Sequence, residues 1–455
     1  MDRLMIGVSG LRGIVGSALT PDIVTHWAMA FGSYLQGGRV VVGRDTRPSG
    51  EMIKHAVLAG LMAEGCSVID VGTGATPSCS LMVRELKADG GIMITGSHNP
   101  AEWNALKFFR ADGIDLNEAE GADLRAIHDE EQFRHVPWHS LVAGRTDATA
   151  SERHVRAILE NVSVEAIRAA GLRVVLDACN GGGAVATPGL LRELGCEMIG
   201  INVEPNGDFV RDPEPIEKNL GALCDAVRDH GAAIGFAQDA DADRIALVAE
   251  GGRFLGEELS LALVARHLLA KTPGAVAINI SSSRMVDDVA ARFDSKVVRT
   301  KVGEVNVAEA VIEHRAVVGG EGNGGIIDPT ICPIRDSLAG IARILEYLAE
   351  TGRPISELAA ELDRYCIRKI KLECTADQAR AVLERAQEVY ADQQVNTLDG
   401  VRIDWPDRWV QVRPSGTEPI IRIIAEARTA SEADRLCDEM ADLARPLIAA
   451  ADATA

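Results

Sequence analysis

Runs of consecutive apolar residues alternate with helical patterns along most of this chain, and this alternation constrains its fold most strongly. In the first third, apolar runs cover residues 40–42, 66–71 and 92–95, and helical patterns cover 20–37, 49–64 and 76–86. A strand that is apolar along its whole length needs cover on both faces, as in a parallel sheet between layers of helices. We therefore predict an α/β fold with a parallel, doubly covered sheet.

The same alternation restarts twice, and the C-terminal part follows another pattern. Predicted strands at 173–177 and 275–280 open a second and a third series. Two further strands, at 409–413 and 420–425, flank a turn, and a helix at 431–448 closes the chain. At ~150 residues per domain, 455 residues suit three or four domains. We predict three similar mixed α/β domains and a C-terminal α+β domain, with bounds at 1–150, 151–252, 253–368 and 369–455.

The chain is acidic, and this limits the partners that it can have. Its formal net charge of -20 argues against binding to nucleic acid or to an anionic membrane. It contains no apolar run of the ~18 residues that a membrane helix requires, and residues 1–5 lack the long apolar segment that is typical of a signal peptide. The nine cysteines include no Cys-x-x-Cys pair, so neither a zinc site nor a disulfide framework is expected. We expect a cytoplasmic protein; a small anionic substrate fits if Arg and Lys side chains gather in one cleft.

A polar turn, Thr95-Gly96-Ser97-His98-Asn99-Pro100, directly follows the apolar run Ile92-Met93-Ile94. Ligands of open α/β sheets bind beyond the carboxyl ends of the strands. A hydroxyl in that place, beside an imidazole, indicates that Ser97 is a nucleophile or a phosphoryl carrier. A phosphorylated serine needs a nearby cation, and Lys107 can be that cation or a proton-transfer group. The alternative is a capped turn without chemistry.

An acidic loop, Asp239-Ala240-Asp241-Ala242-Asp243-Arg244, follows the predicted strand at 232–237. Carboxylates at every second position of an extended loop can turn toward one point, and three oxygen ligands suit Mg²⁺. Arg244 is well placed for a phosphate. An EF-hand is disfavoured because Arg244 stands where its sixth-position glycine is required. A solvated acidic turn is the remaining alternative.

A glycine-rich loop spans Gly319 to Gly325, with five glycines in seven residues. Glycines let another group approach the backbone closely. Glu321 and Asn323 supply the polar side chains, and an acid and an amide can bind adjacent sugar hydroxyls. The alternative is a plain hairpin turn.

The fourth loop is Arg413-Pro414-Ser415-Gly416-Thr417-Glu418-Pro419, with Arg422 following. Two hydroxyls, two guanidinium groups and a glycine turn make a phosphate cradle, with a surface turn as the alternative.

Two N-terminal segments are less informative. Gly7-Val8-Ser9-Gly10-Leu11-Arg12-Gly13 is interpreted as a flexible entry loop in which Arg12 is a further candidate phosphate ligand. The charges of Gly43-Arg44-Asp45-Thr46-Arg47 are assigned only to stapling the start of a helix.

Taken in chain order, the four loops resemble those of the α-D-phosphohexomutase family, over nearly the whole chain. The Ser-His-Asn-Pro turn is similar to its phosphoserine loop, and the Asp-x-Asp-x-Asp-Arg segment to its magnesium loop. The Gly-Glu-x-Asn-Gly segment resembles its sugar loop, and Arg-Pro-Ser-Gly-Thr-Glu-Pro its phosphate-binding loop. Gly96 stands where alanine is usual, a change expected to leave the chemistry intact. Gly325 stands where many relatives have histidine, which leaves the sugar open.

The resemblance implies four domains around a central cleft and an exchange of phosphoryl groups on a hexose phosphate. Ser97 carries the phosphoryl group, and a sugar 1,6-bisphosphate is the intermediate and activator. The implied catalytic residues are Ser97, His98, Lys107, Arg12 and Arg244. The implied ligands of Mg²⁺ are Ser97, Asp239, Asp241 and Asp243. The implied substrate-binding residues are Glu321, Asn323, Arg413, Ser415, Gly416, Thr417 and Arg422.

The resemblance favours conversion of glucosamine 6-phosphate to glucosamine 1-phosphate, with glucose and mannose phosphates as close rivals. A sugar-phosphate phosphatase that uses Asp239 as its nucleophile is the main alternative. A non-catalytic sugar-phosphate sensor is disfavoured, because the serine and all three metal acids are present. We expect a monomer or a homodimer.

Overall fold

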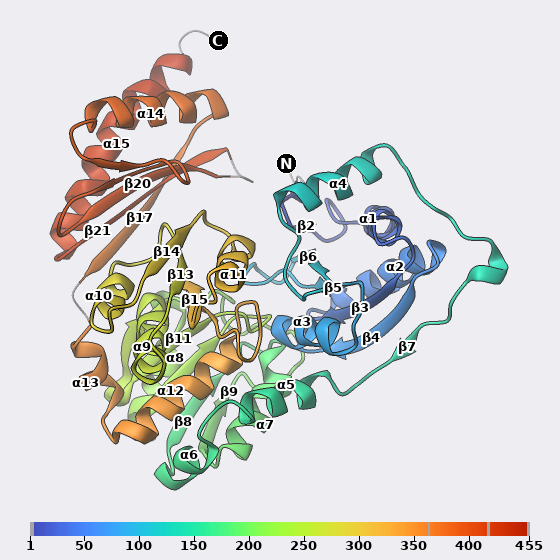
Figure 1. The fold of residues 1–455 in the computed structure, drawn as a ribbon, viewed down its shortest axis with the longest axis horizontal. Helices are drawn as coiled ribbons and strands as arrows, with labels where there is room; N and C mark the ends of the chain where they lie inside the picture. The colour runs from blue at the N-terminus through green and yellow to red at the C-terminus, as the bar shows by residue number, and fades with distance from the viewer. Residues whose placement is uncertain (1–3, 363–364, 416–418, 453–455) are drawn as a thin grey trace.

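The computed structural model describes residues 4–362, 365–415 and 419–452, and their strands form four separate sheets. We call the units built on these sheets domains I to IV, in chain order. In Figure 1, domain I lies on the right in blue and cyan, and domain IV lies at the upper left in red, above domain III. The predicted fold class is confirmed. No helix of the described residues is both long and apolar enough to cross a membrane.

Domain I has a seven-stranded sheet between helices. Its strands are β1 (Met5–Ile6), β2 (Gly10–Ile14), β3 (Arg39–Arg44), β4 (Ser67–Thr73), β5 (Gly90–Ile94), β6 (Trp103–Arg110) and β7 (Arg145–Thr146). Its helices are α1 (Pro21–Tyr34), α2 (Ser49–Ala63), α3 (Thr76–Glu85) and α4 (Glu118–Asp129). The strand order is β1-β2-β6-β5-β3-β4-β7, and β5, β3, β4 and β7 are parallel.

The sheet of domain I is mixed, whereas a wholly parallel one was predicted. Only residues 95–102 connect β5 to β6. A parallel crossover needs about a dozen residues or more, so β6 returns antiparallel beside β5. The predicted serine turn is therefore the connection between two antiparallel neighbours. Residues 10–14 also differ from the prediction, because they form strand β2 along β6 and not a flexible entry loop.

Domain II repeats this arrangement with five strands in the order β12-β11-β10-β8-β9. The strands are β8 (Arg173–Asp177), β9 (Glu197–Ile201), β10 (Ile234–Gln238), β11 (Ile245–Ala249) and β12 (Arg253–Gly256). The helices are α5 (Ala150–Leu159), α6 (Val164–Ala170), α7 (Gly183–Glu193) and α8 (Gly221–Asp229), with short 3-10 turns η2 (Glu217–Asn219) and η3 (Glu250–Gly252). Another 3-10 turn, η1 (Trp138–Ser140), precedes β7 of domain I. The acidic loop joins β10 to its antiparallel neighbour β11. Strand β12 carries this sheet past the predicted boundary at residue 252.

Domain III has four strands in the order β14-β13-β15-β16. They are β13 (Val276–Asn279), β14 (Val297–Thr300), β15 (Val318–Glu321) and β16 (Gly325–Ile327). The helices are α9 (Glu257–Lys271), α10 (Met285–Ala291), α11 (Glu304–Glu313), α12 (Ser337–Thr351) and α13 (Ile355–Ala360). The glycine-rich segment is the hairpin between β15 and β16. In all three α/β domains, a candidate loop thus follows a parallel strand and leads into an antiparallel one.

Domain IV is an antiparallel sheet, in the order β17-β21-β20-β19-β18, covered by two helices. Its elements are β17 (Cys366–Glu373), β18 (Gln394–Asn396), β19 (Val401–Asp404), β20 (Trp409–Pro414), β21 (Ile420–Ala427), α14 (Ala376–Val389) and α15 (Ala430–Asp452). It has a hydrophobic core of its own, while one continuous core passes through domains I to III. Polar contacts join it to domain III, such as that from Ser281 Oγ to Gln411 Oε1 at 2.6 Å.

A buried polar chain ties the first three domains together near the site. Ser78 Oγ on α3 lies 2.9 Å from His154 Nδ1 on α5, and His154 Nε2 lies 2.7 Å from Asp336 Oδ2. Asp336 also caps α12, since its Oδ1 accepts the backbone N–H of Leu338 at 2.9 Å. The side chains of Ser78, His154 and Asp336 are all buried. This hydrogen-bonded series therefore holds the three domains together and is not accessible to a substrate.

Candidate active site

The serine turn after β5 holds Ser97 in a left-handed backbone conformation. Its φ is 49°, a value that a residue with a side chain keeps only where its surroundings impose it. The Ser97 N–H donates to Thr95 Oγ1 at 2.9 Å, and Thr95 Oγ1 donates to Asp45 Oδ2 at 2.6 Å. The side chains of Thr95 and Asp45 therefore hold the backbone of Ser97 in this conformation.

A buried arginine clamps the same turn. Arg47 is 0% exposed, and its guanidinium donates to the carbonyl oxygens of Ser97 at 2.7 Å, Asn99 at 2.7 Å and Pro100 at 2.6 Å. Asp45 Oδ2 balances its charge at 3.0 Å from Nε. The assignment of the charges to a helix staple was wrong for Asp45 and Arg47, since they hold the serine turn, whereas Arg44 does pair with Glu51 in the first turn of α2, at 3.1 Å. The sequence signal that could have found them is a charged pair placed directly after an apolar strand.

The clamp leaves no room beside Gly96. A Cβ at this position would lie 2.8 Å from Arg47 Cζ and 2.8 Å from the carbonyl oxygen of Trp103. The glycine is therefore matched to this particular packing.

The Ser97 hydroxyl lies next to an acid of domain II and lines a small cavity of domain I. Ser97 Oγ lies 3.5 Å from Asp239 Oδ2 and 3.3 Å from His98 Nδ1. A cavity of about 210 Å³ beside it is lined by Arg12 of β2 and Lys107 of β6 as well as by the serine turn. The structure thus brings together five of the predicted site residues from two domains.

The three aspartates of the acidic loop form one buried cluster. Asp239, Asp241 and Asp243 are each 0% exposed, and one carboxylate oxygen of each lies within 4.8 Å of the others. Asp239 Oδ1 accepts the backbone N–H groups of Asp243 at 3.1 Å and Arg244 at 3.2 Å. Asp241 Oδ1 and Asp243 Oδ1 are buried without a hydrogen-bond partner among the described atoms. Buried carboxylate oxygens left open in this way fit a divalent cation.

Cationic side chains surround the acids. Lys107 Nζ lies 2.8 Å from Asp241 Oδ2 and 3.3 Å from Asp243 Oδ2. Arg244 Nε is farther away, at 3.7 Å from Asp243 Oδ1 and 3.9 Å from Asp239 Oδ2. Arg244 is therefore only loosely engaged by the acids.

The electrostatic environment shifts the pKa values of Asp239 and Asp243 in opposite directions. Burial and the charges of Asp243 and Asp241 raise the pKa of Asp239 well above its ordinary value. Burial alone would raise the pKa of Asp243 too, but the nearby charges of Arg335 and Lys107 hold it below its ordinary value. A bound cation would favour the charged form of all three.

The surroundings also shift the pKa values of the two candidate proton-transfer groups, His98 and Lys107, in opposite directions. The positive charge of Arg244, together with burial, lowers the pKa of His98 to about 2, so its imidazole is neutral. Burial opposes the charge on Lys107, but Asp241 and Asp243 outweigh burial and raise its pKa above the ordinary value. At neutral pH His98 is therefore unprotonated and Lys107 is protonated, and a transfer of either proton requires that a bound phosphate first change the field around these groups.

The hairpin of domain III places Glu321 at the end of β15, almost fully buried. Glu321 Oε1 accepts from Asn279 Nδ2 at 2.8 Å and from the Gly303 N–H at 3.2 Å. Glu321 Oε2 accepts from Arg335 Nη1 at 2.7 Å and from Asn323 Nδ2 at 3.4 Å. Although burial opposes ionisation, Arg335 and Asn279 hold its pKa below the ordinary value. The carboxylate is charged and fully engaged by protein donors.

Sequence reasoning missed Arg335, which connects the hairpin to the acid cluster. Its Nη2 lies 2.7 Å from Asp243 Oδ2 and 3.1 Å from Glu304 Oε2, and its Nη1 reaches Glu321. Arg335 stands in the irregular segment between β16 and α12, without a glycine or hydroxyl cluster around it, so no local pattern marks it.

The fourth loop joins the group indirectly. Arg413 Nε lies 3.3 Å from Asp399 Oδ2, and Arg422 lies opposite Arg413 in the β20–β21 ladder. The backbone of Ser415 extends the same ladder. Asp399 Oδ2 also accepts the Val302 N–H at 2.9 Å. The next residue, Gly303, donates its N–H to Glu321, so Asp399 connects Arg413 to the backbone beside Glu321. The other two predicted residues, Gly416 and Thr417, lie outside the described residues.

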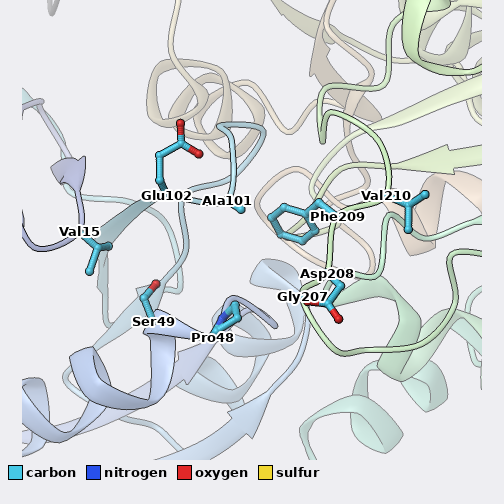
Figure 2. A pocket seen from close by; sticks show the side chains of 9 residues that line it. All are labelled: Val15, Pro48, Ser49, Ala101, Glu102, Gly207, Asp208, Phe209 and Val210. Atoms are coloured by element: carbon cyan, nitrogen blue, oxygen red, sulfur yellow. The ribbon is translucent and has the colours of Figure 1, made fainter.

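A larger hollow, of about 650 Å³, lies between domains I and II, next to the serine turn (Figure 2). Phe209 and Val210, on a loop of domain II, face Ala101 of domain I across it. The Phe209 ring lies 4.8 Å from Arg47 Cζ and so covers the clamp. Ser97 does not line this hollow but does line the smaller cavity, so the smaller cavity belongs to the candidate active site.

The four-domain fold, with a serine turn whose hydroxyl lies 3.5 Å from a metal-competent acid cluster, defines a phosphohexomutase. Models of the phosphoglucomutase/phosphomannomutase family match the chain in all four parts. The alpha/beta/alpha domains I, II and III match residues 3–135, 152–252 and 257–365, and the C-terminal domain matches 370–443. The chain belongs to this family and is an intramolecular phosphotransferase, as the resemblance predicted.

Relatives match nearly the full length. The chain is 43% identical to the "probable phosphoglucosamine mutase" of Methanopyrus kandleri, over 96% of this chain and 97% of the relative. It is 40% identical to the phosphoglucomutase/phosphomannomutase of Thermococcus kodakarensis, over 94% and 96%. A crystal structure of a phosphoglucomutase/phosphomannomutase family protein from Burkholderia thailandensis shares the fold with a TM-score of 0.85 and 25% identity, over 97% of each chain.

Proposed function

We propose that this enzyme interconverts hexose 6-phosphates and hexose 1-phosphates through a phosphoserine at Ser97 and a sugar 1,6-bisphosphate. The observation that carries the proposal is the distance of 3.5 Å between Ser97 Oγ and Asp239 Oδ2, beside a cavity that Ser97, Arg12 and Lys107 line. A serine hydroxyl in that position can pass a phosphoryl group to and from a substrate.

The surroundings of Ser97 are suited to a phosphorylated side chain. A phosphoserine carries about -1.5 to -2 charges, which must be balanced when it is partly buried. Arg12, Arg244 and Lys107 supply positive charge around the hydroxyl. The negative phosphate would also raise the pKa of His98 from its low value toward neutrality, because it offsets the charge of Arg244.

Asp239, Asp241 and Asp243, with a phosphate oxygen on Ser97, are the proposed ligands of Mg²⁺. When bound, Mg²⁺ would stabilise negative charge on the phosphoryl oxygens during transfer.

In the proposed transfer, a sugar hydroxyl oxygen forms a bond to phosphorus while the bond between phosphorus and Ser97 Oγ breaks. The proton of the sugar hydroxyl goes to the neutral imidazole of His98, and Lys107 supplies a proton to Ser97 Oγ. The bisphosphate then turns end for end and returns its other phosphoryl group to Ser97 by the reverse exchange. Arg244 supports the charge on the transferring group.

The remaining predicted residues hold the substrate. Arg413, Ser415 and Arg422, with Gly416 and Thr417, are the proposed partners of its non-transferring phosphate. Glu321 and Asn323 are the proposed partners of the sugar hydroxyls, and Glu321 must exchange at least one of its protein donors for a hydroxyl. A carboxylate that accepts from hydroxyls can serve both orientations of the sugar.

Glucosamine phosphate is the proposed sugar, with glucose and mannose phosphates as alternatives. The name of the Methanopyrus kandleri relative supports glucosamine. The name of the Thermococcus kodakarensis relative supports the alternatives. A solved N-acetylphosphoglucosamine mutase of Aspergillus fumigatus, 16% identical with a TM-score of 0.59, is described in complex with GlcNAc-6P and magnesium, and this match shows the shared fold.

The test is turnover of the purified protein with Mg²⁺ on glucosamine, glucose and mannose 6-phosphates, each primed with its 1,6-bisphosphate. Formation of 1-phosphate supports the proposal, and the ratio of rates identifies the sugar. Release of free phosphate without 1-phosphate would instead support the hydrolase with Asp239 as nucleophile.

The Ser97→Ala variant should keep its melting temperature and lose mutase turnover by several orders of magnitude. Near-normal turnover of this variant would refute the role of Ser97.

A further inference from the structure

Arg335 is a buried cation shared by two domains. Its side chain is 9% exposed and lies within ion-pair distance of three carboxylates. Asp243, at 2.7 Å, belongs to the acidic loop of domain II. Glu321, at 2.7 Å, and Glu304, at 3.1 Å, belong to the sugar hairpin and to the start of α11 in domain III. One guanidinium therefore connects the proposed metal site to the proposed sugar site.

The backbone on both sides of this side chain is fixed. The Arg335 N–H donates to Glu304 Oε1 at 2.7 Å. The next residue, Asp336, caps α12 and pairs with the buried His154. Ser337 Oγ donates to the carbonyl oxygen of Ala242, within the acidic loop, at 2.5 Å. A movement of Arg335 with either the acidic loop or the sugar hairpin would disturb the other, because the segment around Arg335 is bonded to both domains.

The two ends of the guanidinium serve different loops. Nη2 pairs with Asp243, and Nη1 pairs with Glu321. A planar fork with several donors can hold two carboxylates at once in a fixed geometry, whereas a lysine offers a single nitrogen. The charge of Arg335 and the shape of its head group are therefore separable by substitution.

We propose that Arg335 is a positioning residue with two tasks. It acts as the counter-ion of Asp243 in the metal-free enzyme, and it fixes Glu321 relative to the acid cluster for the sugar. This inference rests on the proposed function for the sugar task only, since the counter-ion task can be measured without turnover.

Removal of the charge and removal of the fork should have different effects. In Arg335→Met, the positive charge beside Asp243 is lost, so a divalent cation is no longer repelled at that carboxylate. We expect Mg²⁺ to bind on the order of tenfold more tightly, while the metal-free protein melts at a lower temperature. In Arg335→Lys the charge stays, so Mg²⁺ affinity should be close to that of the wild type. The KM for the hexose phosphate should rise on the order of tenfold, because Glu321 Oε2 loses the donor that ties it to the acid cluster.

Arg343 supplies a matched control on α12. It is also buried and pairs with two carboxylates, Asp328 at 2.7 Å and Glu346 at 3.0 Å, neither of which belongs to the acid cluster or the sugar hairpin. Arg343→Met should lower the melting temperature in the same way and leave the Mg²⁺ affinity unchanged.

The experiment is calorimetric titration of the purified full-length variants with MgCl₂, with melting curves in chelator and steady-state kinetics alongside. Unchanged or weaker Mg²⁺ binding in Arg335→Met would overturn the counter-ion task, and a wild-type KM in Arg335→Lys would overturn the sugar task. Should the methionine variant not fold, the lysine variant carries the test through its KM. Absence of 1-phosphate with the wild-type enzyme would count against the proposed function and leave the Mg²⁺ comparison intact.

Discussion

The arginine clamp under the serine turn gives the sharpest prediction, which concerns the Arg47→Lys variant. Arg47 donates to three carbonyl oxygens of the turn at 2.6–2.7 Å and pairs with Asp45 at 3.0 Å, all without exposure to solvent. A lysine keeps the charge, but its single nitrogen cannot reach all of these partners. Each buried carbonyl oxygen of the turn that is left without a donor costs about 1–3 kcal/mol of the free energy of unfolding.

The catalytic effect of this variant follows from the strained backbone that the clamp supports. Ser97 has a φ of 49°, a conformation that costs of order 1–3 kcal/mol and persists only while its neighbours impose it. Once the turn relaxes, Ser97 Oγ moves relative to Asp239. A displacement of about 1 Å at a reacting group can lower turnover about a hundredfold. We therefore expect kcat to fall by about that factor, with little change in KM.

The assay is steady-state mutase turnover together with urea unfolding of the same preparation. Arg343→Lys is the control, because it weakens a buried arginine pair elsewhere and should lose stability with normal kcat. An unchanged kcat in Arg47→Lys, with the expected loss of stability, would refute the claim that the clamp positions Ser97.

Two further predictions follow from buried contacts around the site. Gly96→Ala should lower both the melting temperature and kcat, because its Cβ would lie 2.8 Å from Arg47 Cζ and from the carbonyl oxygen of Trp103; wild-type values of both would show that the turn accommodates a methyl group. Burial raises the pKa of Glu258, under the sugar hairpin, to about 8. The neutral carboxyl therefore contributes its full stability below the unfolded pKa of about 4.5, and this contribution is lost as the pH rises through 8. Glu258→Gln cannot ionise and should reduce this loss, measured as urea unfolding between pH about 5 and 9; parallel pH profiles of the two proteins would contradict the assignment.

The sequence located the four candidate loops because each loop is a local pattern. Ser97, the three aspartates and Glu321 all follow apolar runs that the structure confirms as strands, and a polar cluster after a buried strand is visible without tertiary information. The strand–helix alternation likewise determined the three α/β domains and the α+β domain, since burial on both faces is written into consecutive apolar residues.

Only the tertiary structure decided how these loops are held and what they contact. Arg47 lies 50 residues before Ser97 in the chain, and Arg335 lies 92 residues after Asp243, so no local pattern connects either pair. The antiparallel return of β6 depends on the length of a connection and brings Lys107 to Asp241, 134 residues away. The identities of the reacting groups are local in sequence, whereas their charges and positions depend on buried partners that only the packing of the domains supplies.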